Sequence, residues 1–170
     1  MSTRYHLRCS TLFHASAEEV WALKTDPEKI QDEFQPLFHA DTTSAQEALA
    51  ALKRGELPVS YTIQMKGAGI LPLGKWPVEV VEYENQSHYV DRSENNVFGY
   101  WRHEHRLQSS SIGTQYTDLV DFEPRSKARW TALALRELFL YRHRRAARHL
   151  PTQPRATAIA TLRELSGSPI

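Results

Sequence analysis

The chain has 170 residues, a length typical of one domain, and 41% of them are hydrophobic, which suffices for a sizeable core. Its 21 basic and 20 acidic residues nearly cancel, which excludes a global field that would steer the protein to nucleic acid or to an anionic membrane. A single cysteine, Cys9, excludes an intrachain disulfide and fits a reducing compartment.

Long apolar runs are missing from the sequence. The first residues contain no run of signal-peptide length, and no stretch approaches the roughly 18 uncharged apolar residues of a membrane-spanning helix. We therefore expect a cytoplasmic protein.

A strand and two short helices come first. Residues 4–13 alternate between apolar and polar side chains, which is typical of a half-buried strand. Ser16 stands three residues before Glu19, the spacing of a helix capping box. Asp26 followed by Pro27 predicts the start of a second short helix.

One more helical stretch and a series of strands follow. Residues 44–54 have small apolar residues at helical spacing and predict a surface helix that ends at Gly55. Alternation and flanking turn residues predict strands over 59–66, 76–83, 88–93, 98–107 and 114–123, with a glycine-containing connection over 67–74.

The hydrophobic period changes after Pro124. Trp130, Leu133, Leu138 and Tyr141 recur at helical spacing and predict the apolar face of a helix of about six turns, ending near Leu150. Residues 151–170 are predicted as a loose tail, with a short helix over 156–165 as one option. Because strands follow strands without helical crossovers, the whole pattern predicts an α+β fold with an antiparallel sheet covered by the last helix.

Strand parity predicts a polar minority on the inner, apolar face of the sheet. The inward residues of three strands are Tyr89 and Asp91, then Trp101, His103, His105 and Leu107, then Tyr116, Asp118 and Val120. Buried carboxylates cost free energy unless they are paired, so these groups favour a cavity that orients a small molecule. A His105–Asp118 pair that only stabilises the sheet is the open alternative.

A set of short motifs stands in a recognisable order. They are Gly74-Lys75-Trp76, Tyr89-Val90-Asp91, Trp101 to Leu107, Gly113-Thr114, Asp118 to Pro124, and Phe139 to Arg148. In this order they resemble the bacterial ligand-binding branch of the START/polyketide-cyclase-like superfamily (SRPBCC, birch-pollen-allergen-like), and Phe13 to Trp21 extends the resemblance to nearly all of residues 4–150. The chain departs from the pattern in Asn96-Val97-Phe98, where members usually have Gly-Pro-Phe, and in a longer segment over 42–54.

The resemblance implies a helix-grip fold. In this fold a curved seven-stranded antiparallel sheet wraps around a long C-terminal helix, and two short helices close one end. It implies that residues 1–150 form a START-like ligand-binding domain, but members include lipid carriers, quinone-binding proteins and polyketide cyclases or dehydratases, so the fold does not choose the function.

We expect a carrier or sensor that binds a small hydrophobic or aromatic molecule, such as a lipid, quinone or polyketide, in an internal cavity without a cofactor. The predicted lining residues are Tyr61, Ile63, Trp76, Tyr89, Asp91, Trp101, His103, His105, Tyr116, Asp118, Val120, Leu138 and Tyr141. The alternative is a cyclase- or dehydratase-like enzyme in which His103, His105 and Asp118 are the acid–base groups.

Two further groups of residues bear on a metal ion and on a surface as partners. His103 and His105 share a strand face and would need a further ligand such as Asp118 to hold a metal, but no Cys partner and no HExxH motif accompany them, so no metal is expected. Four arginines near the end of the last helix, Arg142, Arg144, Arg145 and Arg148, are typical of a solvated helix C-terminus, with weak contact to a membrane surface or to a protein as the alternative.

Overall fold

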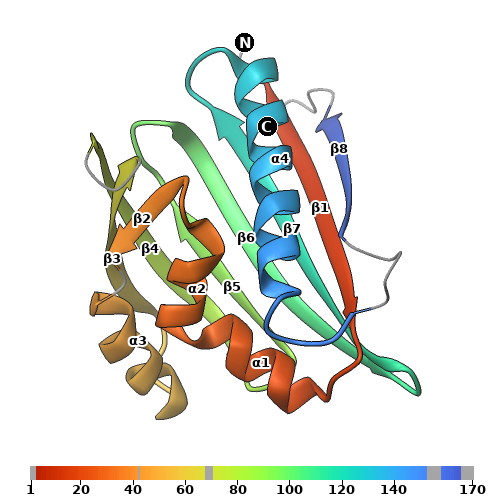
Figure 1. The fold of residues 1–170 in the computed structure, drawn as a ribbon. Coiled ribbons are helices and arrows are strands. Elements are labelled where there is room, and N and C mark those ends of the chain that lie inside the picture. Colours follow the sequence, from red (N-terminus) through yellow and green to blue (C-terminus); the bar gives the residue numbers. More distant parts are fainter. Residues whose placement is uncertain (1–2, 42, 68–70, 153–157, 166–170) are drawn as a thin grey trace.

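The computed structural model describes residues 3–41, 43–67, 71–152 and 158–165, which form one antiparallel sheet and four helices (Figure 1). The helices are α1 (Ala17–Thr25), α2 (Pro27–Phe34), α3 (Thr43–Lys53) and α4 (Ala128–Ala146). The strands are β1 (Arg4–Phe13), β2 (Phe38–Asp41), β3 (Val59–Gly67), β4 (Leu71–Glu84), β5 (His88–Ser93), β6 (Phe98–Ser110), β7 (Gly113–Pro124) and β8 (Ile159–Leu165). None of the helices in these ranges has the length and apolar character that a membrane crossing requires.

The two short helices begin at the predicted capping residues. The Ser16 hydroxyl accepts a hydrogen bond from the Glu19 backbone N–H, and the Glu19 carboxylate accepts one from the Ser16 backbone N–H at 2.8 Å. The Asp26 carboxylate caps α2 by accepting a hydrogen bond from the Glu28 backbone N–H at 2.8 Å, with Pro27 in the first turn. Each cap contributes about 1 kcal/mol of helix stability, which fixes where α1 and α2 start against the end of the sheet.

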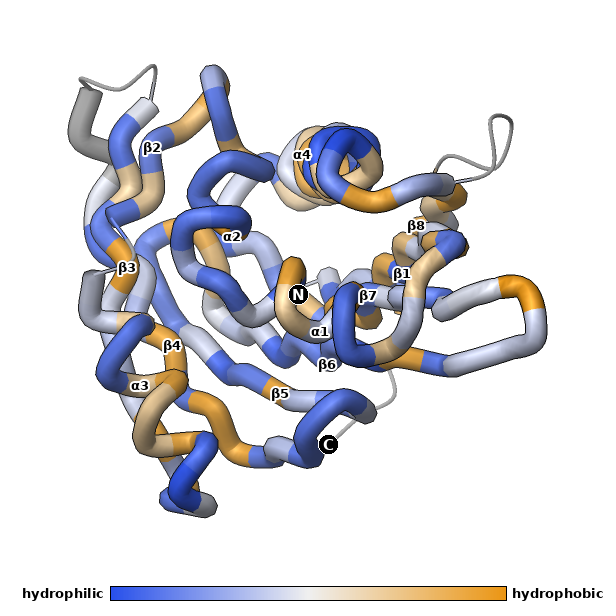
Figure 2. Tube along the Cα trace, turned by 60° about the horizontal axis from the view of Figure 1, so that its bottom comes forward, coloured by the Kyte–Doolittle hydropathy of each residue, from blue (hydrophilic) through white to orange (hydrophobic). Residues whose placement is uncertain are grey.

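The sheet is antiparallel throughout and curved. Its strand order is β2-β3-β4-β5-β6-β7-β1-β8, so the first strand of the chain lies between the last two. Figure 2 shows the sheet curving around α2 and α4, which lie on its concave side. The sheet does not close, because β2 and β8 are its two edges.

The prediction of seven strands is wrong, since the sheet has eight strands in the described part of the chain. Short β2 begins two residues after Pro36 and was not predicted. Residues 159–165, where a short helix was one option, form β8 instead and pair with β1 from Arg4 to Ser10. This pairing covers the edge that β1 would otherwise expose, and Ala160 and Leu162 pack against the core. The segment expected as a tail therefore contributes β8 to the sheet, while residues 153–157 and 166–170 of that segment lie outside the described residues.

Helix α4 buries a different face from the predicted one. Trp130 is 73% exposed and Leu133 is also exposed, whereas Leu138 and Tyr141 are only half-buried. The buried face is formed by Ala132, Leu135, Phe139, Leu140, Arg142, His143 and Ala146. Both series have helical spacing, and the small Ala132 side chain allows the closer approach to the sheet, so spacing alone did not identify the inner face.

The space between α4 and the sheet is filled with side chains. The core cluster combines Leu135 and Phe139 of α4 with sheet residues such as Leu7, Trp101 and Phe122. The Trp101 ring lies 5.0 Å from the Phe98 ring and 5.1 Å from the Trp76 ring, centroid to centroid. Cys9 lies in the same core, and burial raises the pKa of its thiol to about 12.

The observed packing of α4 predicts which of its aromatic residues stabilises the fold. Phe139→Ala should lower the free energy of unfolding by about 3–5 kcal/mol, because it leaves a cavity in the core. Trp130→Ala, a matched change on the exposed side of the same helix, should change it by less than about 0.5 kcal/mol. Urea denaturation of both variants measures this, and the reverse order would contradict the assignment of the buried face.

Candidate functional site

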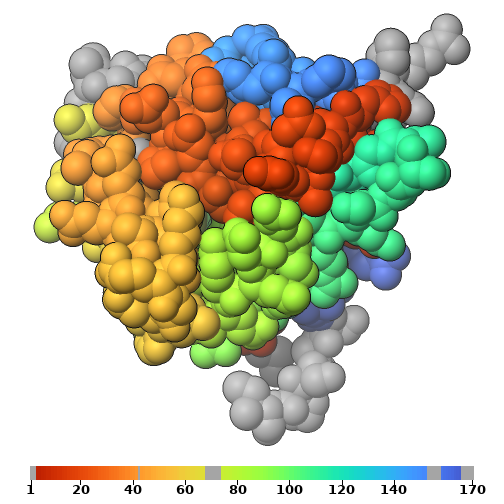
Figure 3. Space-filling model, turned by 90° about the horizontal axis from the view of Figure 1, so that it is seen from below, coloured from red at the N-terminus to blue at the C-terminus, as the bar shows by residue number. Residues whose placement is uncertain are grey.

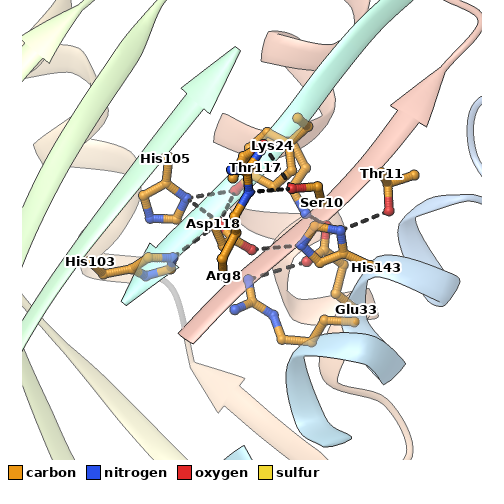
Figure 4. A network of polar contacts seen from close by, with 12 residues as sticks. Arg8, Ser10, Thr11, Lys24, Glu33, His103, His105, Thr117, Asp118 and His143 are labelled. Carbon is orange, nitrogen blue, oxygen red and sulfur yellow. Dashed lines mark hydrogen bonds and ion pairs between the residues drawn. The ribbon is translucent and has the colours of Figure 1, made fainter. Parts of the chain in front are cut away.

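Three imidazoles converge on the carboxylate of Asp118, as Figure 4 shows. Asp118 is fully buried on β7, directly opposite His105 of β6. Its Oδ1 accepts hydrogen bonds from His103 Nε2 at 3.0 Å and from the Tyr116 hydroxyl at 2.5 Å. Its Oδ2 accepts one from His143 Nε2 at 2.9 Å. Both carboxylate oxygens are thus saturated by groups from β6, β7 and α4.

A second carboxylate, Asp91 of β5, lies on the other side of the two β6 histidines. Its Oδ2 is 3.1 Å from His105 Nε2 and 3.6 Å from His103 Nδ1. Its Oδ1 accepts a hydrogen bond from Trp101 Nε1 at 3.3 Å. The remaining His105 nitrogen, Nδ1, lies 2.6 Å from the Tyr116 hydroxyl oxygen and 3.1 Å from Asp118 Oδ1. The two histidines therefore lie between two buried carboxylates.

His143 connects this cluster to helix α4. Because its Nε2–H donates to Asp118, its Nδ1 accepts a hydrogen bond from the Thr11 hydroxyl, at 2.8 Å. Thr11 is buried on β1, so this chain of contacts joins three segments far apart in the sequence. It has the order carboxylate, imidazole and hydroxyl, but the buried hydroxyl is shielded from solvent and serves here to hold the ring.

A buried ion-pair network adjoins the cluster. Glu33 of α2 is fully buried and accepts hydrogen bonds from Lys24 at 2.6 Å and from Arg142 at 3.2 Å. The Lys24 ammonium lies 4.4 Å from the centre of the Tyr116 ring, which places the network against the histidine cluster. Breaking such a pair leaves a buried charge without a partner, so the network fixes α1 and α2 relative to α4.

Burial and neighbouring groups shift the pKa values of Asp118 and of the three imidazoles around it. Burial alone would raise the pKa of Asp118, but its interactions with His103, His105 and His143 outweigh burial and hold that pKa well below its usual range. Burial and the neighbouring His105 lower the pKa of His103. Burial also lowers the pKa of His143. For His105, burial is outweighed by the bonds to Asp118 and Asp91, so its pKa is raised. At neutral pH Asp118 is therefore a carboxylate, His103 and His143 favour the neutral ring, and His105 has a higher pKa than the other two imidazoles.

A small apolar cleft opens between the helices and the sheet on the side of β3, β4 and β5. Its volume is about 50 Å³. It is lined by Thr25, Pro27, Ile30, Ala45, Ala48, Leu49, Leu52, Tyr61, Val80, Tyr83 and Tyr89. In Figure 3 segments that border it meet on one face of the molecule: α1 and α2 in red and orange, α3 in yellow-orange, and the hairpin of β4 and β5 in green.

Tyr89 joins the cleft to the histidine cluster. It lines the cleft, and its ring stacks on the His105 ring with centroids 3.8 Å apart and planes 13° from parallel. The Trp21 ring meets the Tyr89 ring edge-on, with centroids 5.8 Å apart. Burial raises the pKa of the Tyr89 hydroxyl well above its usual value, so this side chain meets the cleft as a neutral phenol.

A larger, polar hollow of about 470 Å³ lies on the outer side of the sheet. Its lining includes His88, Arg102, Glu104 and Arg106. Glu104 was expected on a solvent-exposed face, yet it is largely buried because Arg102 and Arg106 pair with it from either side. This hollow is made of ion-paired side chains and does not resemble an apolar binding site.

The structure brings some predicted site residues together and separates others. Asp91, His103, His105, Tyr116 and Asp118 form the buried cluster, and Tyr61 and Tyr89 line the cleft. Trp76, Trp101 and Val120 belong to the core beneath α4 or pack against it. Ile63, Leu138 and Tyr141 lie outside the cleft lining, and the Tyr141 hydroxyl donates to the Gln35 carbonyl oxygen.

Sequence reasoning missed the contributions of the helices to the site. His143 and Arg142 were seen only as part of a basic run, and Thr11, Lys24 and Glu33 were not considered as site residues. The signal was present in α4, where Ala132, Leu135, Phe139, Arg142 or His143, and Ala146 recur at three- and four-residue steps. Of the four arginines grouped there, Arg142 is buried and Arg145 is half-buried beside Asp32 at 2.8 Å, which leaves Arg144 and Arg148 exposed.

Comparison with known proteins identifies a family and a fold. The family described as "Domain of unknown function (DUF8410)" matches residues 11–150, and no curated protein matches the chain. Among solved structures, a protein from Chromobacterium violaceum (CV1439) is similar at 12% identity and a TM-score of 0.63, over 87% of this chain and 99% of that one. An AHSA1-like protein from Aeromonas hydrophila is similar at 13% identity and a TM-score of 0.61, over 85% and 92% of the two chains.

A further similar structure is DynU16, a protein of the dynemicin biosynthetic locus. Its likeness covers 85% of this chain but 46% of DynU16, at 18% identity and a TM-score of 0.53. At such identities these likenesses show the fold alone.

The position of Asp118 predicts a large effect of a small substitution. Asp118→Asn should lower the free energy of unfolding by about 3–5 kcal/mol, because it removes the charge that three imidazoles share in a buried site. Asp121→Asn is a matched control on the opposite face of β7, where the carboxylate is one-third exposed and pairs with His6 at 2.6 Å. The control should cost less than about 1 kcal/mol in urea denaturation, and equal costs would contradict the central role of Asp118.

Proposed function

Its match over residues 11–150 shows that this chain belongs to the DUF8410 family, and we propose that it binds a small apolar or aromatic molecule at the cleft between α2, α3 and the sheet. The observation that carries the proposal is the chemistry of this cleft. Its walls are apolar apart from Thr25 and the hydroxyl groups of three tyrosines, and one of these, Tyr89, stacks on His105 of the polar cluster. Apolar walls with a few polar groups are what orient a small ligand.

The present volume of the cleft requires that a ligand be admitted by a movement of the helices. About 50 Å³ is far below the roughly 300–1,000 Å³ of ligand pockets. Helix α3 faces the cleft mainly with Ala45, Ala48, Leu49 and Leu52, whose side chains are small or aliphatic, so an outward shift of α3 exposes little apolar surface. A ligand that fills the opened space covers the apolar surface that the shift of α3 exposes, and it thereby stabilises the open form.

Membership of the START/polyketide-cyclase-like superfamily forms part of the proposal. The order of the sequence motifs, the curved sheet around α4 and the likeness to an AHSA1-like protein and to a protein of the dynemicin locus support it. The expected cavity is placed differently, since aromatic side chains fill the space beneath α4 and the cleft lies at the other side of the concave face.

The other functions considered have less support from the geometry. An acid–base role for His103 and His105 would require substrate access, but each of these residues is only 5% exposed and the Tyr89 ring stacks on His105. A membrane-surface role for the arginines near the end of α4 has less support, because Arg142 is buried against Glu33 and cannot contact a membrane surface. A binder or carrier therefore fits the site best.

The cleft predicts a binding experiment with a matched pair of variants. Anilinonaphthalene sulfonate should bind the wild-type chain with a fluorescence increase, and myristate, menadione or 2-naphthol should displace it. Ala45→Trp, which fills the cleft, should weaken probe binding at least about tenfold, or 1.4 kcal/mol. Ala50→Trp places the same side chain on the exposed side of α3 and should leave binding unchanged.

Three results would contradict the proposal. They are an absence of probe binding to the folded wild-type chain, equal binding by the two tryptophan variants, and failure of every competitor to displace the probe. Circular dichroism of each variant establishes that the chains compared are folded.

A further inference from the structure

Three side chains of the buried cluster, those of Asp91, His103 and His105, each offer one ligand atom, and these atoms all lie within 4.8 Å of one another. Asp91 Oδ2 faces His103 Nδ1 and forms a hydrogen bond with His105 Nε2. The carboxylate oxygen is 3.1 Å from His105 Nε2 and 3.6 Å from His103 Nδ1. All three side chains are buried, so they form a site inside the protein and differ from the acidic clusters common on surfaces.

The spacing of these atoms suits a transition-metal ion. Nitrogen and oxygen atoms bound at about 2.0–2.2 Å to a tetrahedral ion lie roughly 3.3–3.5 Å apart. The two distances from Asp91 fall on either side of this value. Small rotations of the rings would therefore place all three atoms on one ion. Two imidazoles and one carboxylate are a ligand set that Zn²⁺ and Fe²⁺ accept.

The opposite atom of each ligand already has a hydrogen-bond partner. His103 Nε2 bonds to Asp118 Oδ1 at 3.0 Å, and His105 Nδ1 bonds to the Tyr116 hydroxyl oxygen at 2.6 Å. Asp91 Oδ1 accepts from Trp101 Nε1 at 3.3 Å. Metal-binding imidazoles usually donate their other N–H to a carboxylate or similar acceptor, which fixes the tautomer and presents the lone pair to the ion.

No hydrogen bond joins His103 Nδ1 to the Asp91 carboxylate. Because Nε2 of His103 donates to Asp118, a neutral ring has its lone pair on Nδ1, facing the Asp91 carboxylate. Two electron-rich atoms then face each other at 3.6 Å, beyond hydrogen-bond distance. A cation between them would turn this unfavourable contact into a favourable one.

The two buried carboxylates of the cluster also favour the binding of a cation. In the described part of the chain, Asp91 and Asp118 have no ion pair with Lys or Arg, and their ion-pair partners are His103, His105 and His143. Two buried carboxylates without a permanent positive partner are costly. A divalent ion bound by Asp91, His103 and His105 would compensate both, one by direct ligation and one through the imidazoles.

We propose that Asp91, His103 and His105 bind a divalent transition-metal ion, with Asp118, Tyr116 and Trp101 holding the ligands in place. The sequence favours no metal and offers Asp118 as a candidate further ligand; in this proposal Asp91 is the third ligand and Asp118 is the partner that orients His103. Three protein ligands leave at least one coordination position for water or a small molecule. The site lies beneath Tyr89 and does not depend on ligand binding in the cleft.

Metal binding by the full chain tests this proposal directly. The protein is stripped of metal with a chelating resin and titrated with Co²⁺, whose visible absorption reports imidazole and carboxylate ligation. We expect one Co²⁺ per chain and its displacement by Zn²⁺. Asp91→Asn, which keeps the shape of the side chain, should weaken Co²⁺ binding by at least about 100-fold, since ligand loss should exceed the 10–100-fold effect of losing an outer partner.

Two controls separate this site from adventitious binding. Asp121→Asn removes the carboxylate of the partly exposed His6–Asp121 pair, and His88→Gln removes an outer-face imidazole that lies 3.3 Å from Glu84. Both variants should bind Co²⁺ as the wild type does. Absence of stoichiometric binding by the wild type, or equal binding by Asp91→Asn, overturns the proposal.

A second readout serves if Asp91→Asn fails to fold. Nitrogen-15 spectra of the wild-type histidine side chains should show Zn²⁺ shifting the resonances of His103 Nδ1 and His105 Nε2. Shifts confined to exposed imidazoles, such as those of His88 and His149, would overturn the proposal.

Discussion

The buried carboxylate of Asp118 is the constraint on which the rest of the interior depends. A charge that is fully buried costs several kcal/mol unless donors surround it, and here the donors come from β6, β7 and α4. Satisfying both oxygens fixes the rings of His103 and His143 and, through Tyr116, that of His105. The position of α4 over the sheet follows, because Phe139 and Ala146 enter the core on the same helix face that delivers His143 to Asp118.

The cleft and the polar cluster are two parts of one concave face with different packing. Under α4, Trp101 and Phe139 belong to a packed core and fill the space where the sequence predicted a ligand cavity. At the other side, α3 approaches the sheet through alanines and leucines, and a cleft remains beside Tyr61 and Tyr89. The stacked rings of Tyr89 and His105 form the boundary, so an occupant of the cleft would contact a phenol that lies directly on the histidine cluster.

Strand parity made the inner face predictable, because charged residues alternate with Trp101, His103 and His105 and leave one orientation for the strand. The capping residues Ser16 and Asp26 likewise marked the starts of α1 and α2. The pairing partners could not be predicted, since register between strands decides that Asp91 faces His103 while Asp118 faces His105. The buried face of α4 and strand β8 were missed because helical spacing fits two faces and because a seven-residue segment gains its strand structure from β1, far away in the sequence.

The protonation states of the three buried imidazoles test the role of Asp118 most directly. Nitrogen-15 spectra of the metal-free wild-type chain, recorded as a pH titration, should show His103 and His143 protonated at Nε2 and a pKa for His105 above those of the other two rings. The tautomers follow from the hydrogen bonds of His103 and His143 to Asp118, and the raised pKa of His105 follows from its bonds to Asp118 and Asp91. Three rings that exchange between tautomers and titrate together near the ordinary histidine pKa would show that Asp118 does not organise the site.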